Sequence, residues 1–186
     1  MLRRLLGILA MPVVALVALL PAPKSWFYQN RRPTRLGRVV NRAWSWMAGA
    51  GLTPNAWPGE PRIGTIALET RGRRSGQART HVVTWVEHDR ERYLVSMLGD
   101  VSDWVRNARA AGGEAFVRHG GRRQVRLEEV PADQRARILQ AYLKRTAMST
   151  AYHLGLDAGA PLVEFERIAA KHPVFRIREA DVPESP

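Results

Sequence analysis

The segment from Leu68 to Arg79 is the feature that most constrains the fold of this chain. Residues 63–70 before it and residues 80–86 after it have the composition of strands. The connection between them carries two glycines, one serine and several arginines. Glycine can adopt positive φ, so that successive amide groups point into one concavity, and arginine offers a forked donor suited to phosphate or carboxylate. The segment therefore predicts a hairpin with an anion-binding turn, with a plain solvated turn as the alternative.

A second motif, Ser102-Asp103-Trp104-Val105-Arg106-Asn107, follows the third predicted strand. Ser102 is expected to cap a helix that runs to about Ala111, with Asp103 favourable in its first turn. The chain as a whole predicts the order strand, basic turn, strand, strand, helix, strand, strand, helix. The elements expected around the motif are strands at 82–87, 92–97, 114–119 and 122–130, a helix from Pro131 to Arg145, a helix from Pro161 and a strand at 174–178.

These motifs resemble those of the deazaflavin-dependent nitroreductase and quinone reductase family, which uses coenzyme F420 on a split β-barrel. The family pattern Thr-x-Gly-Arg-Lys-Ser/Thr-Gly-x-x-Arg is similar to residues 70–79, and its Trp-x-x-Asn pattern is similar to Trp104 and Asn107. Arg74 stands in place of the usual lysine and keeps the charge, while the proline usual near Val82 is missing. The resemblance implies an α+β fold: a split β-barrel (FMN-binding-like) of about six mostly antiparallel strands with flanking helices, preceded by an apolar N-terminal helix.

The resemblance also implies a reaction and a site. Reduced deazaflavin would give a hydride to an electron-poor acceptor, which we expect to be a quinone, with nitroaromatic reduction as a side activity. The residues expected to hold the phosphate and anionic tail of the cofactor are Arg73, Arg74, Ser75, Gly76, Gln77 and Arg79. The residues expected near its ring are Ser96, Met97, Trp104 and Asn107. Tyr152 or His153 is the expected proton donor.

Two other functions stay open on the sequence. One is an FMN-binding split-barrel oxidoreductase, and the other is a non-catalytic protein that binds an anionic membrane surface through the arginine turn. The five histidines show no pairing at helical spacing, so no metal site is expected. The chain has no cysteine and no Walker or Rossmann glycine pattern, which argues against thiolate chemistry and a nucleotide fold of those types.

The positive charge of the chain is concentrated near its N-terminus. Residues 1–60 carry eight lysines and arginines against Glu60 alone, a net charge of +7 out of +12 for the whole chain. Nucleic-acid binding is not expected, because no nucleic-acid-binding motif accompanies the charge. Residues 5–23 form an uncharged apolar run that would span about 28 Å as a helix. We predict an uncleaved membrane anchor, with a cleaved signal peptide as the alternative.

Four segments follow from these patterns. They are an apolar anchor at 1–24, a basic segment with an amphipathic helix (34–48) and a linker at 25–60, the cofactor-binding barrel at 61–180, and a polar tail at 181–186. Positive charge is heavier after the apolar run than before it, which predicts that the barrel lies at the cytoplasmic face of the membrane. The oligomeric state is left open, with a homodimer among the alternatives.

Overall fold

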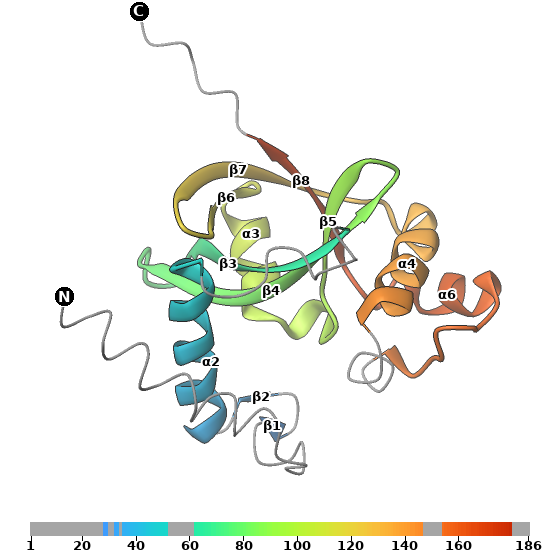
Figure 1. Cartoon of the computed structure of the whole chain (residues 1–186), viewed down its shortest axis with the longest axis horizontal. Helices are drawn as coiled ribbons and strands as arrows, with labels where there is room; N and C mark the ends of the chain where they lie inside the picture. Colours follow the sequence, from blue (N-terminus) through green and yellow to red (C-terminus); the bar gives the residue numbers. More distant parts are fainter. Residues whose placement is uncertain (1–27, 30–31, 34, 52–61, 147–153, 180–186) are drawn as a thin grey trace, which may run out of the picture.

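The centre of the molecule is a closed barrel of six strands in the order β3-β4-β5-β8-β7-β6 (Figure 1). The computed structural model describes residues 28–29, 32–33, 35–51, 62–146 and 154–179. Every neighbouring pair in the barrel is antiparallel. The strands are β3 (Ile63–Arg71), β4 (Ala78–His88), β5 (Glu91–Val95), β6 (Glu114–Arg118), β7 (Arg122–Glu129) and β8 (Val174–Glu179). The predicted barrel of about six strands is therefore confirmed, while the predicted apolar helix lies outside the described residues.

Alternation of side chains along the strands separates the barrel interior from its outer face. Leu68 of β3 and Val83 and Trp85 of β4 belong to one apolar cluster that fills the interior. Val86 of β4 points to the other face and belongs to a second cluster, which the outer helices complete. Two packed layers thus share β4, and a change of register by one residue would exchange them.

Helix α3 (Asp103–Ala110) contributes to the interior cluster through Trp104, Val105 and Ala108. The ring of Trp104 meets Phe175 edge-on, with 5.4 Å between centroids and 63° between planes. An eight-residue helix is marginal in water, so this apolar face is what stabilises α3.

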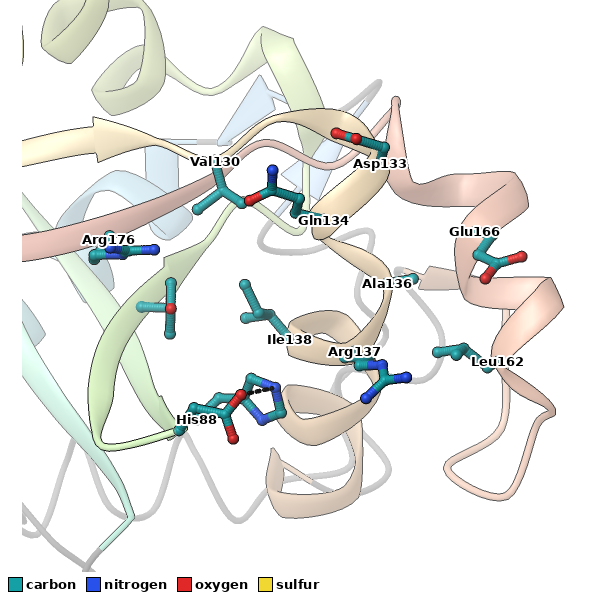
Figure 2. Close-up of a pocket in the computed structure, with 12 residues that line it drawn as sticks. His88, Val130, Asp133, Gln134, Ala136, Arg137, Ile138, Leu162, Glu166 and Arg176 are labelled. Carbon is teal, nitrogen blue, oxygen red and sulfur yellow. Dashed lines mark ion pairs between the residues drawn. The ribbon is translucent and has the colours of Figure 1, made fainter.

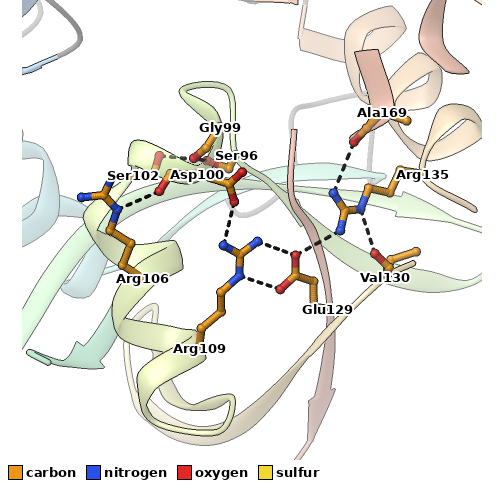
Figure 3. Close-up of polar contacts among 10 residues, drawn as sticks. All are labelled: Ser96, Gly99, Asp100, Ser102, Arg106, Arg109, Glu129, Val130, Arg135 and Ala169. Carbon is orange, nitrogen blue, oxygen red and sulfur yellow. Dashed lines mark hydrogen bonds and ion pairs between the residues drawn. The ribbon is translucent and has the colours of Figure 1, made fainter. Parts of the chain in front are cut away.

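The predicted N-cap residue of α3 is confirmed in its position, but its side chain makes a different contact. Ser102 occupies the N-cap position of α3, but its hydroxyl makes no capping hydrogen bond. Its Oγ lies 2.8 Å from the Oγ of Ser96, which in turn donates to the carbonyl of Gly99 at 2.8 Å (Figure 3). Since each hydroxyl has one proton, Ser102 is the donor to Ser96. A buried tertiary contact has replaced the local cap.

Within the described residues, three helices flank the barrel on its outside: α2 (Arg35–Gly49), α4 (Ala136–Thr146) and α6 (Leu162–Ala169). Helix α4 packs on β4 and β5, and α2 contacts β3 and β4, so that α2 and the α4–α6 pair lie on different sides of the barrel in Figure 1. The helix predicted from Pro131 begins later, at Ala136, because a 3-10 turn, η3 (Ala132–Gln134), follows the proline.

The remaining elements are short. They are the paired strands β1 (Tyr28–Gln29) and β2 (Arg32–Pro33) and the 3-10 turn η2 (Gly99–Val101). Among the described helices, none has both the length and the apolar character needed to cross a bilayer.

A network of charged groups joins the inner and outer parts of the fold (Figure 3). Arg109 of α3 binds Glu129 through two hydrogen bonds of 2.7 Å and Asp100 through one of 2.6 Å. Arg135 is only 7% exposed and donates to Glu129, at 3.0 Å, and to the carbonyls of Val130 and Ala169. Glu129 therefore bridges two arginines: Arg109 of α3, and Arg135, which immediately precedes α4.

Removing the charge of Glu129 is expected to destabilise the fold at neutral pH. The hydrogen bond from Arg109 lowers the pKa of Glu129. This carboxylate therefore stabilises the native state above pH 4.5, its ordinary pKa, and the contribution is lost as the pH falls through the lowered value. Glu129→Gln should reduce the free energy of unfolding by about 1–3 kcal/mol at pH 7. The variant should also lose less of this free energy on acidification than the parent protein does.

Urea unfolding at pH 7 and below pH 4.5 measures both effects. Glu164→Gln is the matched control, because Glu164 pairs with Arg167 on the solvent side of α6 and exposed pairs contribute little. Equal stability of Glu129→Gln and the parent protein at both pH values would contradict the role of Glu129.

Candidate functional site

The basic turn (residues 71–79) is closed by its own backbone. Gly72 donates its N–H to the carbonyl of Gln77 and Gly76 donates to Gly72, both at 2.8 Å. Gly76 has a φ of 67°, which glycine adopts without strain. A Cβ at Gly72 would lie 3.0 Å from the Gln77 carbonyl oxygen, so a larger residue there would push the turn apart slightly. The geometry of the predicted anion-binding turn therefore favours glycine at both positions.

The basic turn carries donors that the described part of the protein leaves unused. Within that part, the side chains of Arg74 and Arg79 form no hydrogen bond or ion pair, and the amide groups of Arg74 and Ser75 have no partner. Arginines elsewhere on the barrel, such as Arg122 and Arg178, are paired with glutamates. Free guanidinium groups next to free amides fit a phosphate or another polyanion.

Asn107 joins the two sequence motifs. This residue is 3% exposed and donates from Nδ2 to the hydroxyl of Thr70 at 3.3 Å. Its Oδ1 accepts from both the backbone N–H and the guanidinium of Arg73, each at 3.2 Å. Arg73 also reaches Asp103 at 3.1 Å. Helix α3 and the basic turn are therefore held as one unit, and Arg73, unlike Arg74 and Arg79, is occupied within the chain.

The other predicted ring contacts lie deeper than the basic turn. Ser96 is 1% exposed and its hydroxyl is engaged with Gly99 and Ser102. Met97 is partly buried and packs against the outer cluster, whereas Trp104 is buried in the inner one. Their contact with a cofactor ring stays a prediction. Tyr152 and His153, the predicted proton donors, lie outside the described residues.

The sequence interpretation missed two side chains at this site. His81 lies two residues after Arg79 on the same face of β4, and Asp103 pairs with Arg73 at the start of α3. Burial lowers the pKa of His81, nearby Asp103 acts to raise it, and Arg79 acts to lower it. The alternation of side chains along β4 could have identified His81 as a site residue, because it places His81 on the same face as Arg79.

A separate pocket of about 350 Å³ lies between the β4–β5 turn, α4 and α6 (Figure 2). Val130, Ile138 and Leu162 contribute apolar surface to it, but most of its lining is polar and includes both acidic and basic side chains, among them Glu166 and Arg137. None of the predicted site residues lines this pocket. Because its charges are mixed in sign, it lacks the concentration of free cations found at the basic turn.

The fold is that of a split-barrel protein, and its basic turn carries donors of a kind that suits an anion. Residues 39–166 match the family model of the F420H2-dependent quinone reductases. The chain belongs to this family, whose members are oxidoreductases that use reduced coenzyme F420. The predicted family and its cofactor are thereby confirmed. The unused donors of the basic turn fit the phosphate of that cofactor.

The comparison with solved structures gives matches that are distant in sequence and have low TM-scores. An F420-H2 dependent reductase, FDR-A, is 20% identical, with a TM-score of 0.38 over 61% of this chain and 93% of that one. A further F420 reductase is 14% identical, with a TM-score of 0.36 over 62% and 86%. ChuZ of Campylobacter jejuni is 12% identical, with a TM-score of 0.40 over 62% of this chain, which spans 47% of ChuZ. None of the curated proteins matches the chain.

Proposed function

We propose that this protein binds reduced coenzyme F420 at the basic turn and reduces a quinone. The observation that carries the proposal is a pair of arginines, Arg74 and Arg79, that have no partner among the described residues and lie on a turn that Asn107 fixes to the barrel. When bound, the reduced deazaflavin supplies a hydride. The two guanidinium groups would hold the phosphate and anionic tail, and the barrel and α3 would orient the rest of the cofactor.

Reduction of a quinone to a hydroquinone consumes one hydride and one proton. The hydride comes from the cofactor, so the chain must admit a proton to the acceptor oxygen. Tyr152 and His153 are the proposed sources of that proton. Nitroaromatics, which are also electron-poor, are proposed as secondary acceptors.

We further propose that the protein acts at the cytoplasmic face of the membrane. The apolar run at residues 5–23 and the +7 charge of residues 1–60 support this location. Helix α2 adds a suitable surface, because Arg42 and Trp46 are both exposed and lie one turn apart on it. Trp46 is 46% exposed, and tryptophan beside arginine is typical of the membrane interface. A quinone dissolved in the bilayer would then meet the barrel directly.

The proposed function predicts a preference among ligands. Full-length protein in lipid nanodiscs should bind F420 more tightly than FMN, because the cations of the basic turn exceed the needs of one phosphate and suit a longer anionic tail. It should also oxidise reduced F420 when the nanodiscs contain a quinone. Fluorescence titration and absorbance of the reduced cofactor measure the two properties. Equal affinity for FMN, or no oxidation with quinone, would contradict the proposal.

A further inference from the structure

The inward-facing row of β4 leads from the barrel core to the basic turn. Its members are Trp85, Val83, His81 and Arg79, in that order, because alternate residues of a strand share one face. Trp85 and Val83 lie in the interior cluster, and His81 is paired across the ladder with Leu68 of the same cluster. His81 is therefore the first polar side chain between the core and the basic turn.

Two charged groups act on the pKa of His81. Asp103 of α3 acts to raise it, and Arg79 of the same strand acts to lower it. Asp103 is itself held by Arg73 of the basic turn, at 3.1 Å. His81 thus belongs to the same group of side chains as the proposed phosphate site, although it takes no part in the contacts described above.

The two ring nitrogens of His81 differ in their surroundings. Nδ1 is buried and has no hydrogen-bond partner among the described residues. Nε2 also has no partner among the described residues, and it is not one of the buried side-chain atoms that lack a partner. A proton on Nδ1 would be a buried donor without an acceptor, which is unfavourable. Of the two neutral tautomers, the one with its proton on Nε2 avoids this buried donor.

We propose that His81 contacts the ligand of the basic turn, donating its Nε2–H to an oxygen atom of the bound cofactor. This inference rests on the proposed binding of F420 and adds a residue that the motifs do not contain. A neutral donor is favoured over an imidazolium because Arg79 lies beside the ring and because the second proton would occupy the unpartnered Nδ1. Binding should then take up no proton at His81.

The test uses full-length protein and F420 itself. His81→Leu removes the donor and should weaken F420 binding by about tenfold, the size expected for one hydrogen bond to an anionic ligand. His81→Gln keeps an N–H near the position of Nε2 but cannot titrate, and should stay within about threefold of the parent protein. Calorimetry at pH 6.5 in two buffers of different ionisation enthalpy should give the same heat, since no proton is exchanged.

Nitrogen-15 NMR of the parent protein reads the ring directly and does not depend on the folding of a variant. It should show the Nε2–H tautomer without ligand and a shift of that resonance when F420 is added. An imidazolium, an unshifted resonance, or equal affinity of a folded His81→Leu variant would overturn the inference about His81 alone. If the parent protein does not bind F420, the proposed function fails and this inference fails with it.

Discussion

Replacing Arg74 and Arg79 together by alanine is expected to lower the affinity for reduced F420 by about a hundredfold to ten-thousandfold. Hydrogen bonds to charged groups contribute about 1.5–3 kcal/mol each, and every 1.4 kcal/mol is a factor of about ten in affinity. Neither side chain has a partner within the described part of the protein, so the apoprotein should keep its stability. Fluorescence titration with F420 and thermal unfolding of the apoprotein measure the two quantities.

The matched control removes two cations elsewhere. Arg137 and Lys144 are exposed on α4, outside the basic turn, and their double alanine variant changes the net charge by the same amount. Its affinity for F420 should stay within about threefold, because exposed charges beyond a Debye length are largely screened. If both double variants lose affinity equally, the effect comes from the overall charge and the assignment of the phosphate site is wrong.

The local features of the fold were predictable because they have local causes. Glycine at 72 and 76 and the alternating strands on either side predict the hairpin, and Gly120 with Gly121 predicts the next one. The ends of elements were less predictable. The third strand ends at Val95 rather than at residue 97, because its ladder with β8 stops where Val95 faces Val174. Closure of the barrel could be predicted only from the family resemblance. The pairing of β5 with β8 joins segments about 80 residues apart, and no local pattern in the sequence indicates it.

The candidate site shows the same division between local and tertiary causes. The donors of the basic turn could be named from the sequence, because the residues that form them are contiguous. Ser102 is the N-cap residue as predicted, but its hydroxyl makes no capping bond, since Ser96 takes that hydroxyl from outside the helix. The role of Asn107 was also hidden, because its partners Thr70 and Arg73 lie more than 30 residues away. Sequence spacing cannot report such contacts.

Substituting Asn107 by alanine is expected to disrupt the site even before any cofactor binds. The change removes the Nδ2 donor to the buried hydroxyl of Thr70, which keeps only its contact with the carbonyl of Arg79, and it removes the acceptor of the Arg73 amide, so a loss of about 1–3 kcal/mol is expected. The apoprotein should therefore unfold at lower urea concentration, and the amide of Arg73 should exchange faster with solvent. Turnover with a quinone should fall by about a hundredfold, because a displacement near 1 Å has an effect of that size.

The stability of the apoprotein separates this role from a direct contact with the cofactor ring. Arg106→Ala is the control, because Arg106 is on the exposed side of the same helix and its contact is with the carbonyl of Asp100. It should leave the exchange of the Arg73 amide unchanged. If Asn107→Ala lowers turnover while stability and Arg73 exchange match the parent protein, then Asn107 acts on the cofactor and not on the basic turn. If instead both change together, the hydrogen bonds of Asn107 position the arginines, and α3 is part of the cofactor site through them.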